Sequence, residues 1–197
     1  MKKLVVLFAL VGLFLVGCQD SGDVGIVGPD NSAKNTNSSA SVSFLKMPAS
    51  LEPRPLHKDM SFEITPQTGG HISYTESYMS ATGMVTVDLD LRFPPNSVSE
   101  TMTVIVDVSN DELTGEISLS FGPSPTTFLK PAYLTFKVTG LDPNSLPSDP
   151  KDITFVYFDN GIYVPMKAQL IKVDPSIGTL EVKEGEMPHF SRYGYAT

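Results

Sequence analysis

Strict alternation of apolar and polar residues is the dominant pattern along this chain. Between residues 84 and 93, every second residue is apolar and the residues between them are polar or charged. A period of two places one face of a β-strand in a core and the other in water, as in an antiparallel sheet that is covered on one side. We therefore predict a strand with a buried face and a solvated face. The buried face is made of Val85, Val87, Leu89, Leu91 and Phe93, and the solvated face carries Thr86, Asp88, Asp90 and Arg92.

Similar short runs recur at about the 8–12-residue spacing of a β-sandwich, and each is bounded by Gly, Pro, Asn or Asp. The Asp159-Asn160-Gly161 turn between two apolar runs is typical of a tight hairpin. The strands leave no room for an α-helix, so we predict an all-β fold, an antiparallel β-sandwich of immunoglobulin-like type. The predicted strands are residues 60–65, 71–78, 84–93, 101–108, 117–121, 132–138, 154–158, 162–164, 167–173, 179–182 and 189–196.

Prolines mark the segments that we predict to lie outside the hydrogen-bond ladders of the sheets. Pro123, Pro125 and Pro131 have no N–H to donate, so we predict that they confine a loop to the rim of a sheet. Residues 44–58 contain three more prolines and are predicted to lie along the domain surface, so a chain beginning near Lys58 should fold alone. After the loop, one strand face carries Ala132, Leu134, Phe136 and Val138.

The amino end has the composition of a secretion signal. Lys2 and Lys3 precede an apolar run, residues 4–16, that is too short to span a bilayer. Its ending, Leu15-Val16-Gly17-Cys18, resembles the lipobox of bacterial lipoproteins. The resemblance implies that residues 1–17 are removed as a signal peptide and that Cys18 receives a diacylglyceryl group and fatty acid such as palmitate. The alternative is an ordinary signal peptide followed by an incidental cysteine.

The lipobox implies a domain order and a location. Residues 18–43 would be the lipidated cysteine and a flexible, disordered tether, because this polar segment cannot bury enough apolar surface to fold, and residues 44–197 would be the folded domain. Two or three acyl chains on Cys18 hold a protein stably on a membrane, which is the first expected partner. Gln19 follows the cysteine where aspartate would signal inner-membrane retention, so we expect the outer membrane of the cell envelope. Whether the domain is periplasmic or surface-exposed stays open.

The net charge limits the classes of partner, and the cysteine content limits the sources of stability. The formal net charge of -8 excludes nucleic acid as a partner, because a phosphate backbone requires a basic face. An unknown protein or glycan ligand remains. Cys18 is the only cysteine, so the stability of the domain must come from packing rather than from a disulfide.

Four short segments together resemble the ZU-five domain, the β-sandwich module of ankyrins and netrin receptors. The resemblance spans residues 69–196 and implies a binding or scaffolding role, although the spectrin partner of ankyrins does not transfer to a bacterial lipoprotein. Asn96 stands where the family prefers glycine, and asparagine tolerates the left-handed backbone of such a position. The segments are Gly69-Gly70, Arg92-Phe93-Pro94-Pro95, the Gly/Pro and Phe-Leu-Lys-Pro stretch of residues 121–131, and His189-Phe190-Ser191.

The last segment is the candidate for chemistry. In ZU-five-type domains of death-domain signalling proteins, a His-Phe-Ser motif is a self-cleavage site at which the serine attacks the preceding phenylalanine carbonyl. On a strand His189 and Ser191 would share a face, so that the imidazole could act as a base. The alternative is that Phe190 is a core residue of the last strand, with Ser191, Tyr193 and Tyr195 on the other face. We expect the bond to stay intact and the chain not to be an enzyme.

Other polar residues give weaker patterns. His57, His71 and His189 lack the spacing of a metal site, and we expect no metal or cofactor. Asp142, Asp149 and Asp152 lack the spacing of a calcium loop and are predicted to form polar turns. The candidates for a sugar-stacking platform, with ordinary packing as the alternative, are Tyr74, Tyr78, Tyr157 and Tyr163.

These observations predict an envelope-anchored lipoprotein that presents a β-sandwich as a binding or structural module without catalytic activity. Two alternatives stay open. One is a self-processing module that cleaves its own Phe190–Ser191 bond, and the other is a carbohydrate-binding module.

Overall fold

The computed structural model describes residues 42, 44–51, 57–109, 115–159 and 161–197. These residues belong to one compact unit, which runs from Ala40 to Thr197. The predicted signal peptide, the lipobox with Cys18, and the tether up to residue 41 lie outside the described residues. Within those residues, no helix has both the length and the apolar character needed to cross a membrane.

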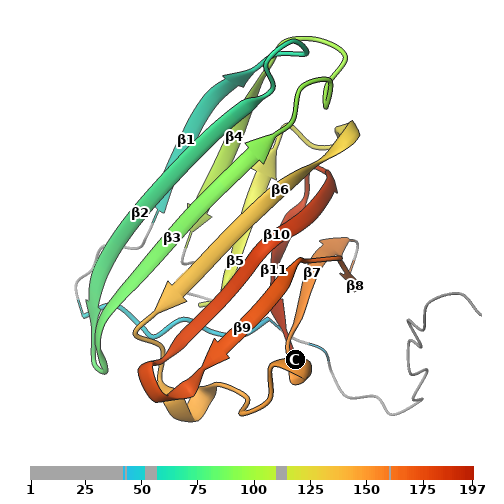
Figure 1. Cartoon of the computed structure of the whole chain (residues 1–197). Helices are drawn as coiled ribbons and strands as arrows, with labels where there is room; N and C mark the ends of the chain where they lie inside the picture. The colour runs from blue at the N-terminus through green and yellow to red at the C-terminus, as the bar shows by residue number, and fades with distance from the viewer. Residues whose placement is uncertain (1–41, 43, 52–56, 110–114, 160) are drawn as a thin grey trace, which may run out of the picture. The chain divides into compact units, whose positions relative to one another are not determined.

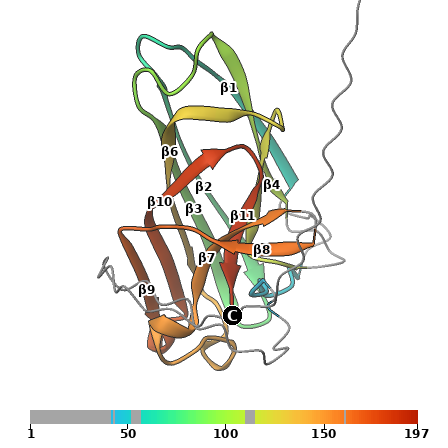
Figure 2. The ribbon, with the colours of Figure 1, turned by 90° about the vertical axis from the view of Figure 1, so that its right-hand side faces the viewer.

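The described residues confirm the prediction of an all-β fold built from antiparallel strands. Eleven strands and three single 3-10 turns make up its regular structure. One sheet has six strands in the order β1-β4-β5-β11-β7-β8, and the other has five in the order β2-β3-β6-β10-β9. The five-stranded sheet faces the viewer in Figure 1, and Figure 2 shows β6, β10 and β9 on one side with β1, β4 and β8 on the other.

The strand bounds agree with the sequence prediction along most of the chain. The strands of the six-stranded sheet are β1 (His57–Ile64), β4 (Met102–Ser109), β5 (Ser118–Gly122), β11 (Arg192–Ala196), β7 (Thr154–Asp159) and β8 (Ile162–Pro165). Those of the five-stranded sheet are β2 (Gly70–Ser80), β3 (Gly83–Phe93), β6 (Thr127–Thr139), β10 (Thr179–His189) and β9 (Leu170–Asp174). The predicted hairpin is also present, with Asp159 paired to Ile162.

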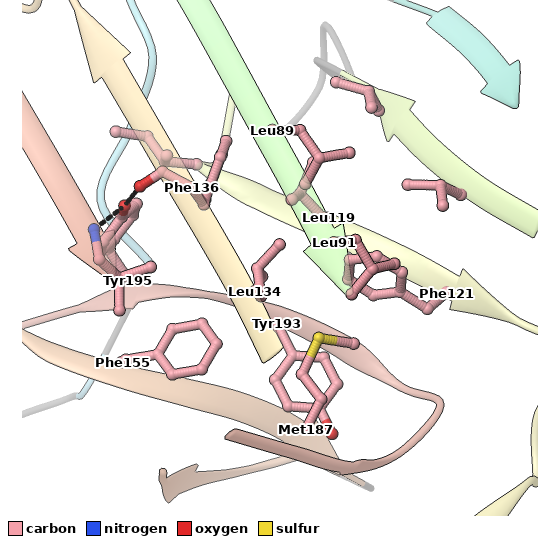
Figure 3. Close-up of a cluster of buried hydrophobic side chains, with 14 of the residues drawn as sticks. Leu89, Leu91, Leu119, Phe121, Leu134, Phe136, Phe155, Met187, Tyr193 and Tyr195 are labelled. Carbon is pink, nitrogen blue, oxygen red and sulfur yellow. Dashed lines mark hydrogen bonds between the residues drawn. The ribbon is translucent and has the colours of Figure 1, made fainter. Parts of the chain in front are cut away.

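One core lies between the two sheets. The apolar faces predicted for β3 and β6 are both buried, and their side chains belong to a single cluster with residues of the six-stranded sheet. Figure 3 shows Leu89, Leu91, Leu134 and Phe136 of the five-stranded sheet among aromatic residues such as Tyr193 of the six-stranded sheet. Burial of these faces is the main stabilising term available to a domain without a disulfide.

Tyr195 ties the two sheets together inside this core. Its hydroxyl group accepts a hydrogen bond from the backbone N–H of Val182 on β10 (2.9 Å) and donates one to the carbonyl oxygen of Phe136 on β6 (Figure 3). Complete burial raises the pKa of the Tyr195 phenol well above its usual value. The hydroxyl therefore keeps the proton that it donates at physiological pH.

The N-terminal segment corrects one prediction. Residues 44–51 were expected on the surface, but Phe44 is 3% exposed and Met47 is 7% exposed. The N–H of Leu45 donates to the carbonyl of Tyr195 on β11, and the N–H of Ile117, just before β5, donates to the carbonyl of Leu45. The segment thus fills the place where β5 and β11 diverge, because its two large apolar side chains gain more from burial than from exposure.

Phe44 also builds a second, smaller apolar cluster. It packs with the buried Val156 and Ala196, and Phe158 and Tyr163 lie against the cluster. The Phe44 and Tyr163 rings meet edge to face at 4.9 Å, and the Arg192 guanidinium lies 5.0 Å from the centre of the Phe44 ring. Aromatic and cation–π contacts of this kind add to the burial that holds the segment in place.

The proline-rich stretch corrects another prediction. Pro123 and Pro125 lie between β5 and β6, as expected, whereas Pro131 lies inside β6. Its missing N–H is tolerated because neither neighbouring strand forms a regular hydrogen-bond ladder with β6 at this residue. β3 pairs with β6 only from Tyr133 onward, and the register of β10 against β6 shifts next to Pro131.

Candidate functional site

The His189-Phe190-Ser191 motif lies at a corner and not on the last strand. β10 ends at His189, β11 begins at Arg192, and the two intervening residues form a bend. Figure 2 shows the chain turning there from the five-stranded sheet into the six-stranded sheet. The prediction that His189 and Ser191 share one face of a strand is therefore wrong, because the period of two is interrupted between them.

Phe190 is a core residue, as predicted by the alternative to a self-cleavage site. It is 2% exposed, and its ring meets that of Phe128 edge to face with centroids 4.8 Å apart. Tyr193 and Tyr195 were expected on the opposite face, but both are also fully buried. The change of sheet at the corner explains this, since it turns all three aromatic side chains toward the same core.

The polar groups of the corner bind different carbonyl oxygens. His189 Nδ1 lies 3.2 Å from the carbonyl oxygen of Phe190, and Ser124 Oγ donates to that same oxygen at 3.4 Å. Ser191 Oγ instead donates to the carbonyl of Phe158 on β7 at 3.0 Å. The corner thus directs two polar side chains at the carbonyl that a self-cleavage reaction would attack, while the hydroxyl that would attack it is hydrogen-bonded elsewhere.

Tyr193 holds the corner from the inside. Its hydroxyl donates to the carbonyl oxygen of His189 at 2.8 Å, and burial raises the pKa of this phenol far above its usual value. The His189 ring packs edge-on against the Tyr157 ring at 4.6 Å, and its centroid lies 6.1 Å from that of the Tyr193 ring. These contacts fix the imidazole between two tyrosines, with its Nδ1 toward the Phe190 carbonyl.

A second candidate site is an open groove on the outer face of the five-stranded sheet. Its volume is about 600 Å³. We call it the Arg92 groove, and it is lined by residues 68–71 before and at the start of β2, residues 92–94 at the end of β3, Tyr133 of β6 and Glu184 of β10. The four strands lie side by side in Figure 1, so residues far apart in the sequence meet on one surface.

Strand register places three of the groove side chains in one row. His71 pairs with Arg92 across β2 and β3, and Arg92 pairs with Tyr133 across β3 and β6. Residues that face each other across neighbouring strands point to the same side of a sheet. Because Val85 to Phe93 alternate inward, Arg92 and its two partners must point outward.

Glu184 enters the groove through a β-bulge. Lys183 and Glu184 of β10 together oppose Thr135 of β6, and the register shifts between Val182 and Gly185. Glu184 has a φ of 47°, a left-handed backbone that is uncommon for glutamate, and its N–H donates to Thr135 Oγ1 at 3.3 Å. A bulge re-aims a side chain, and here it brings the Glu184 carboxylate to the Arg92 guanidinium.

A chain of polar contacts runs along the groove. His71 Nε2 lies 2.7 Å from Asp90 Oδ2, Arg92 Nε lies 3.7 Å from Asp90 Oδ1, and the Arg92 guanidinium donates to the Glu184 carboxylate. These four side chains are 40–55% exposed. Exposed ion pairs contribute only about 0–1 kcal/mol each, so the fold does not depend on them.

The tyrosines proposed as a stacking platform do not form one. Tyr74, Tyr78 and Tyr157 pack against the main core, and Tyr163 packs against the Phe44 cluster, so the packing alternative is confirmed. Tyr78 also donates to the carbonyl of Pro48 at 2.7 Å, and burial raises the pKa of Tyr78 to about 12.

The acidic residues proposed for a calcium loop have a local explanation. Asp142 and Asp149 each cap a 3-10 turn, Pro143–Ser145 and Pro150–Asp152, by accepting a backbone hydrogen bond two residues on. This confirms the prediction of polar turns. His71 lies in the groove and His189 at the corner, and no group of three or more His, Cys, Asp or Glu suited to a metal occurs among the described residues.

The sequence-based placement of Asp90 and Arg92 on a solvated face is confirmed. That Arg92 lines a groove together with Tyr133 and Glu184 was not predicted. The strand order β2-β3-β6-β10 that joins them has no local signal in the sequence. In comparisons with known proteins, no family model matches the chain, and neither does a curated protein or a solved structure.

Proposed function

We propose that this chain is an envelope-anchored bacterial lipoprotein that presents a ZU-five-like β-sandwich as a non-catalytic binding or structural module. The observation that carries the proposal is Leu15-Val16-Gly17-Cys18 directly behind the apolar run of residues 4–16. The lipid on Cys18 makes the membrane the first partner, and Gln19 favours the outer membrane. The polar residues up to 43 act as a tether between lipid and domain.

The positions of the four resembling segments support the ZU-five-like fold. Gly69-Gly70 opens β2, Pro94-Pro95 follows β3, the Gly/Pro stretch joins β5 to β6, and His189-Phe190-Ser191 forms the corner between β10 and β11. All four lie at strand ends or irregularities, where backbone conformation constrains residue type.

The Arg92 groove supports a binding role. It is open, its polar side chains are positioned by register and by a bulge, and the fold gains little from their exposed contacts. The fold thus positions these polar side chains although their contacts contribute little to its stability. Such a groove is a suitable surface for a protein or glycan ligand.

The anchor is tested by replacing Cys18 with serine. We expect wild-type protein to incorporate labelled palmitate in cells, and the Cys18→Ser protein to accumulate as a precursor without label, because serine has no thiol to accept the diacylglyceryl group. Ser21→Ala, in the adjacent tether, is the matched control and should retain the label. Labelled fatty acid on the Cys18→Ser protein would contradict the proposal.

A second candidate function is self-cleavage at the Phe190–Ser191 bond. The observation that favours it is the convergence of Ser124 Oγ and His189 Nδ1 on the Phe190 carbonyl oxygen, where negative charge would develop during attack. In that reaction Ser191 Oγ attacks the Phe190 carbonyl carbon, the peptide C–N bond breaks with a proton passing to the nitrogen, and water hydrolyses the resulting ester.

We predict that the bond stays intact in the purified protein. The Ser191 hydroxyl donates to the carbonyl oxygen of Phe158 and not to His189, so His189 is not placed to act as its base. The N–H of Phe190 donates to Thr126, and the carbonyl of Ser191 accepts from Phe121, which holds the chain on both sides of the bond.

Intact-mass spectrometry checks this prediction, with Ser191→Ala and Ser124→Ala as comparison proteins. All three should have the full mass. A species ending at Phe190 that disappears in Ser191→Ala but persists with protease inhibitors would favour self-cleavage instead.

A further inference from the structure

The Arg92 groove has the dimensions of a small-ligand site. Its volume of about 600 Å³ lies within the range of roughly 300–1,000 Å³ that is usual for such sites. Four strands contribute to its lining, so its shape is held by sheet hydrogen bonds and not by loops alone.

Arg92 and Glu184 are the oppositely charged side chains that line the groove, and they pair with each other. The Arg92 guanidinium contacts carboxylates on both sides, Asp90 and Glu184, and Asp90 is also within hydrogen-bond distance of His71. An anionic ligand would meet the Glu184 carboxylate, and a cationic ligand would have to compete with Arg92 for that carboxylate. The groove is therefore poorly suited to a charged ligand.

The same side chains suit a ligand with neutral hydroxyl groups. A hydroxyl donates one hydrogen bond and accepts up to two, so it can donate to Glu184 and accept from Arg92. Hydrogen bonds to ionised partners are stronger than those between neutral groups. The side chains are 40–55% exposed, which leaves them free to make such bonds without unfolding any element.

Tyr133 adds an aromatic surface beside these groups. It pairs with Arg92 on β3 and with Glu186 on β10, so it lies in the same outward row. An aromatic ring offers an apolar face together with a polar hydroxyl tip. A pyranose has the complementary surface, with C–H groups on its faces and hydroxyls around its rim.

The backbone supports the assignment independently. Glu184 adopts a left-handed conformation that costs free energy for a residue with a side chain, and such positions cluster at binding sites. The bulge places the Glu184 carboxylate where it lines the groove.

We propose that the Arg92 groove binds a neutral saccharide, with Tyr133 packing against a sugar ring and with Arg92 and Glu184 hydrogen-bonded to its hydroxyls. The proposal rests on the function proposed above, because it names the ligand class of that binding module. The overall charge of -8 agrees with a neutral sugar rather than an acidic one.

Calorimetric titration of the purified full-length protein in mild detergent tests the proposal. The probes are soluble β-1,3-glucan, starch, galactomannan, arabinoxylan and galactan, with heparin as an anionic polysaccharide. At least one neutral polymer should bind, and its dissociation constant should rise about tenfold or more in Tyr133→Ala and in Arg92→Gln. Lys172→Ala, on the exposed part of β9 outside the groove, is the matched control and should bind as wild type does.

Three outcomes would overturn the proposal. They are the absence of binding to all five neutral polymers, binding that both groove substitutions leave unchanged, and tighter binding to heparin than to any neutral polymer. Thermal unfolding of each variant confirms that the domain is folded. Labelling of Cys18 with fatty acid does not depend on these substitutions, so failure here is distinguishable from failure of the anchor.

Discussion

Replacing Leu134 with alanine is expected to lower the free energy of unfolding by about 2–5 kcal/mol, the usual cost of truncating a buried leucine. Leu134 is completely buried on β6, which β3 and β10 flank on both sides. It pairs with Leu91, and Figure 3 shows it among the labelled core residues. The neighbouring strands hold the backbone in place, so the cavity cannot collapse easily.

Chemical denaturation of wild type and Leu134→Ala measures this effect. Lys137→Ala, three residues along the same strand and on its outer face, is the control and should change the stability by less than about 1 kcal/mol. A change below about 0.5 kcal/mol for Leu134→Ala, the range of surface substitutions, would mean that the inner face of β6 is misassigned.

Removing residues 42–56 is expected to lower the free energy of unfolding by roughly 3–6 kcal/mol, because burial of a phenylalanine or methionine contributes about 1.5–3 kcal/mol. The truncation removes the buried side chains of Phe44 and Met47 and leaves the N–H of Ile117 without the carbonyl of Leu45. The sequence-based expectation was that a chain beginning near Lys58 folds alone; the buried Phe44 and Met47 imply that such a chain loses part of its core.

The measurement compares urea unfolding of a chain of residues 42–197 with that of residues 57–197. Phe44→Leu in the longer chain is the control, since leucine retains most of the apolar burial and should cost much less than the truncation. Equal midpoints and slopes for the two chains would contradict the assignment of residues 44–51 to the fold.

The fold could be predicted from sequence where one strand face is apolar and the other polar. β3 and β6 satisfy this condition along most of their length, and their buried residues were identified correctly. Asn96 could also be anticipated, and it has the left-handed φ of 61° that asparagine tolerates. In each case the information is local, because side-chain alternation and backbone preference act within a few residues.

The rest depends on contacts between distant residues. The bulge at Glu184 breaks the alternation of β10, so the strand was predicted to end at residue 182 although it continues to His189. The corner at Phe190 was not recognisable because no Gly, Asn or Asp marks a turn between residues 186 and 193. Phe44 and Met47 are three residues apart, which does not match the period of two, and the prolines nearby pointed to a loop.

The candidate sites were predictable only in part. The sequence identified His189-Phe190-Ser191 through a resemblance, but the contact of Ser124 with the Phe190 carbonyl joins residues 66 positions apart. The groove requires the order of four strands, which is a property of the whole sheet. Residue types alone could not show that His71, Arg92 and Tyr133 form one row.

The central claim, that Cys18 anchors this domain to a membrane, is tested most directly by mass spectrometry of the N-terminal peptide from protein purified out of membranes. We expect a peptide that begins at Cys18 and carries the mass of a diacylglyceryl group with or without an added acyl chain. A peptide that begins at Met1, or one with Cys18 unmodified, in protein from the membrane fraction would contradict it.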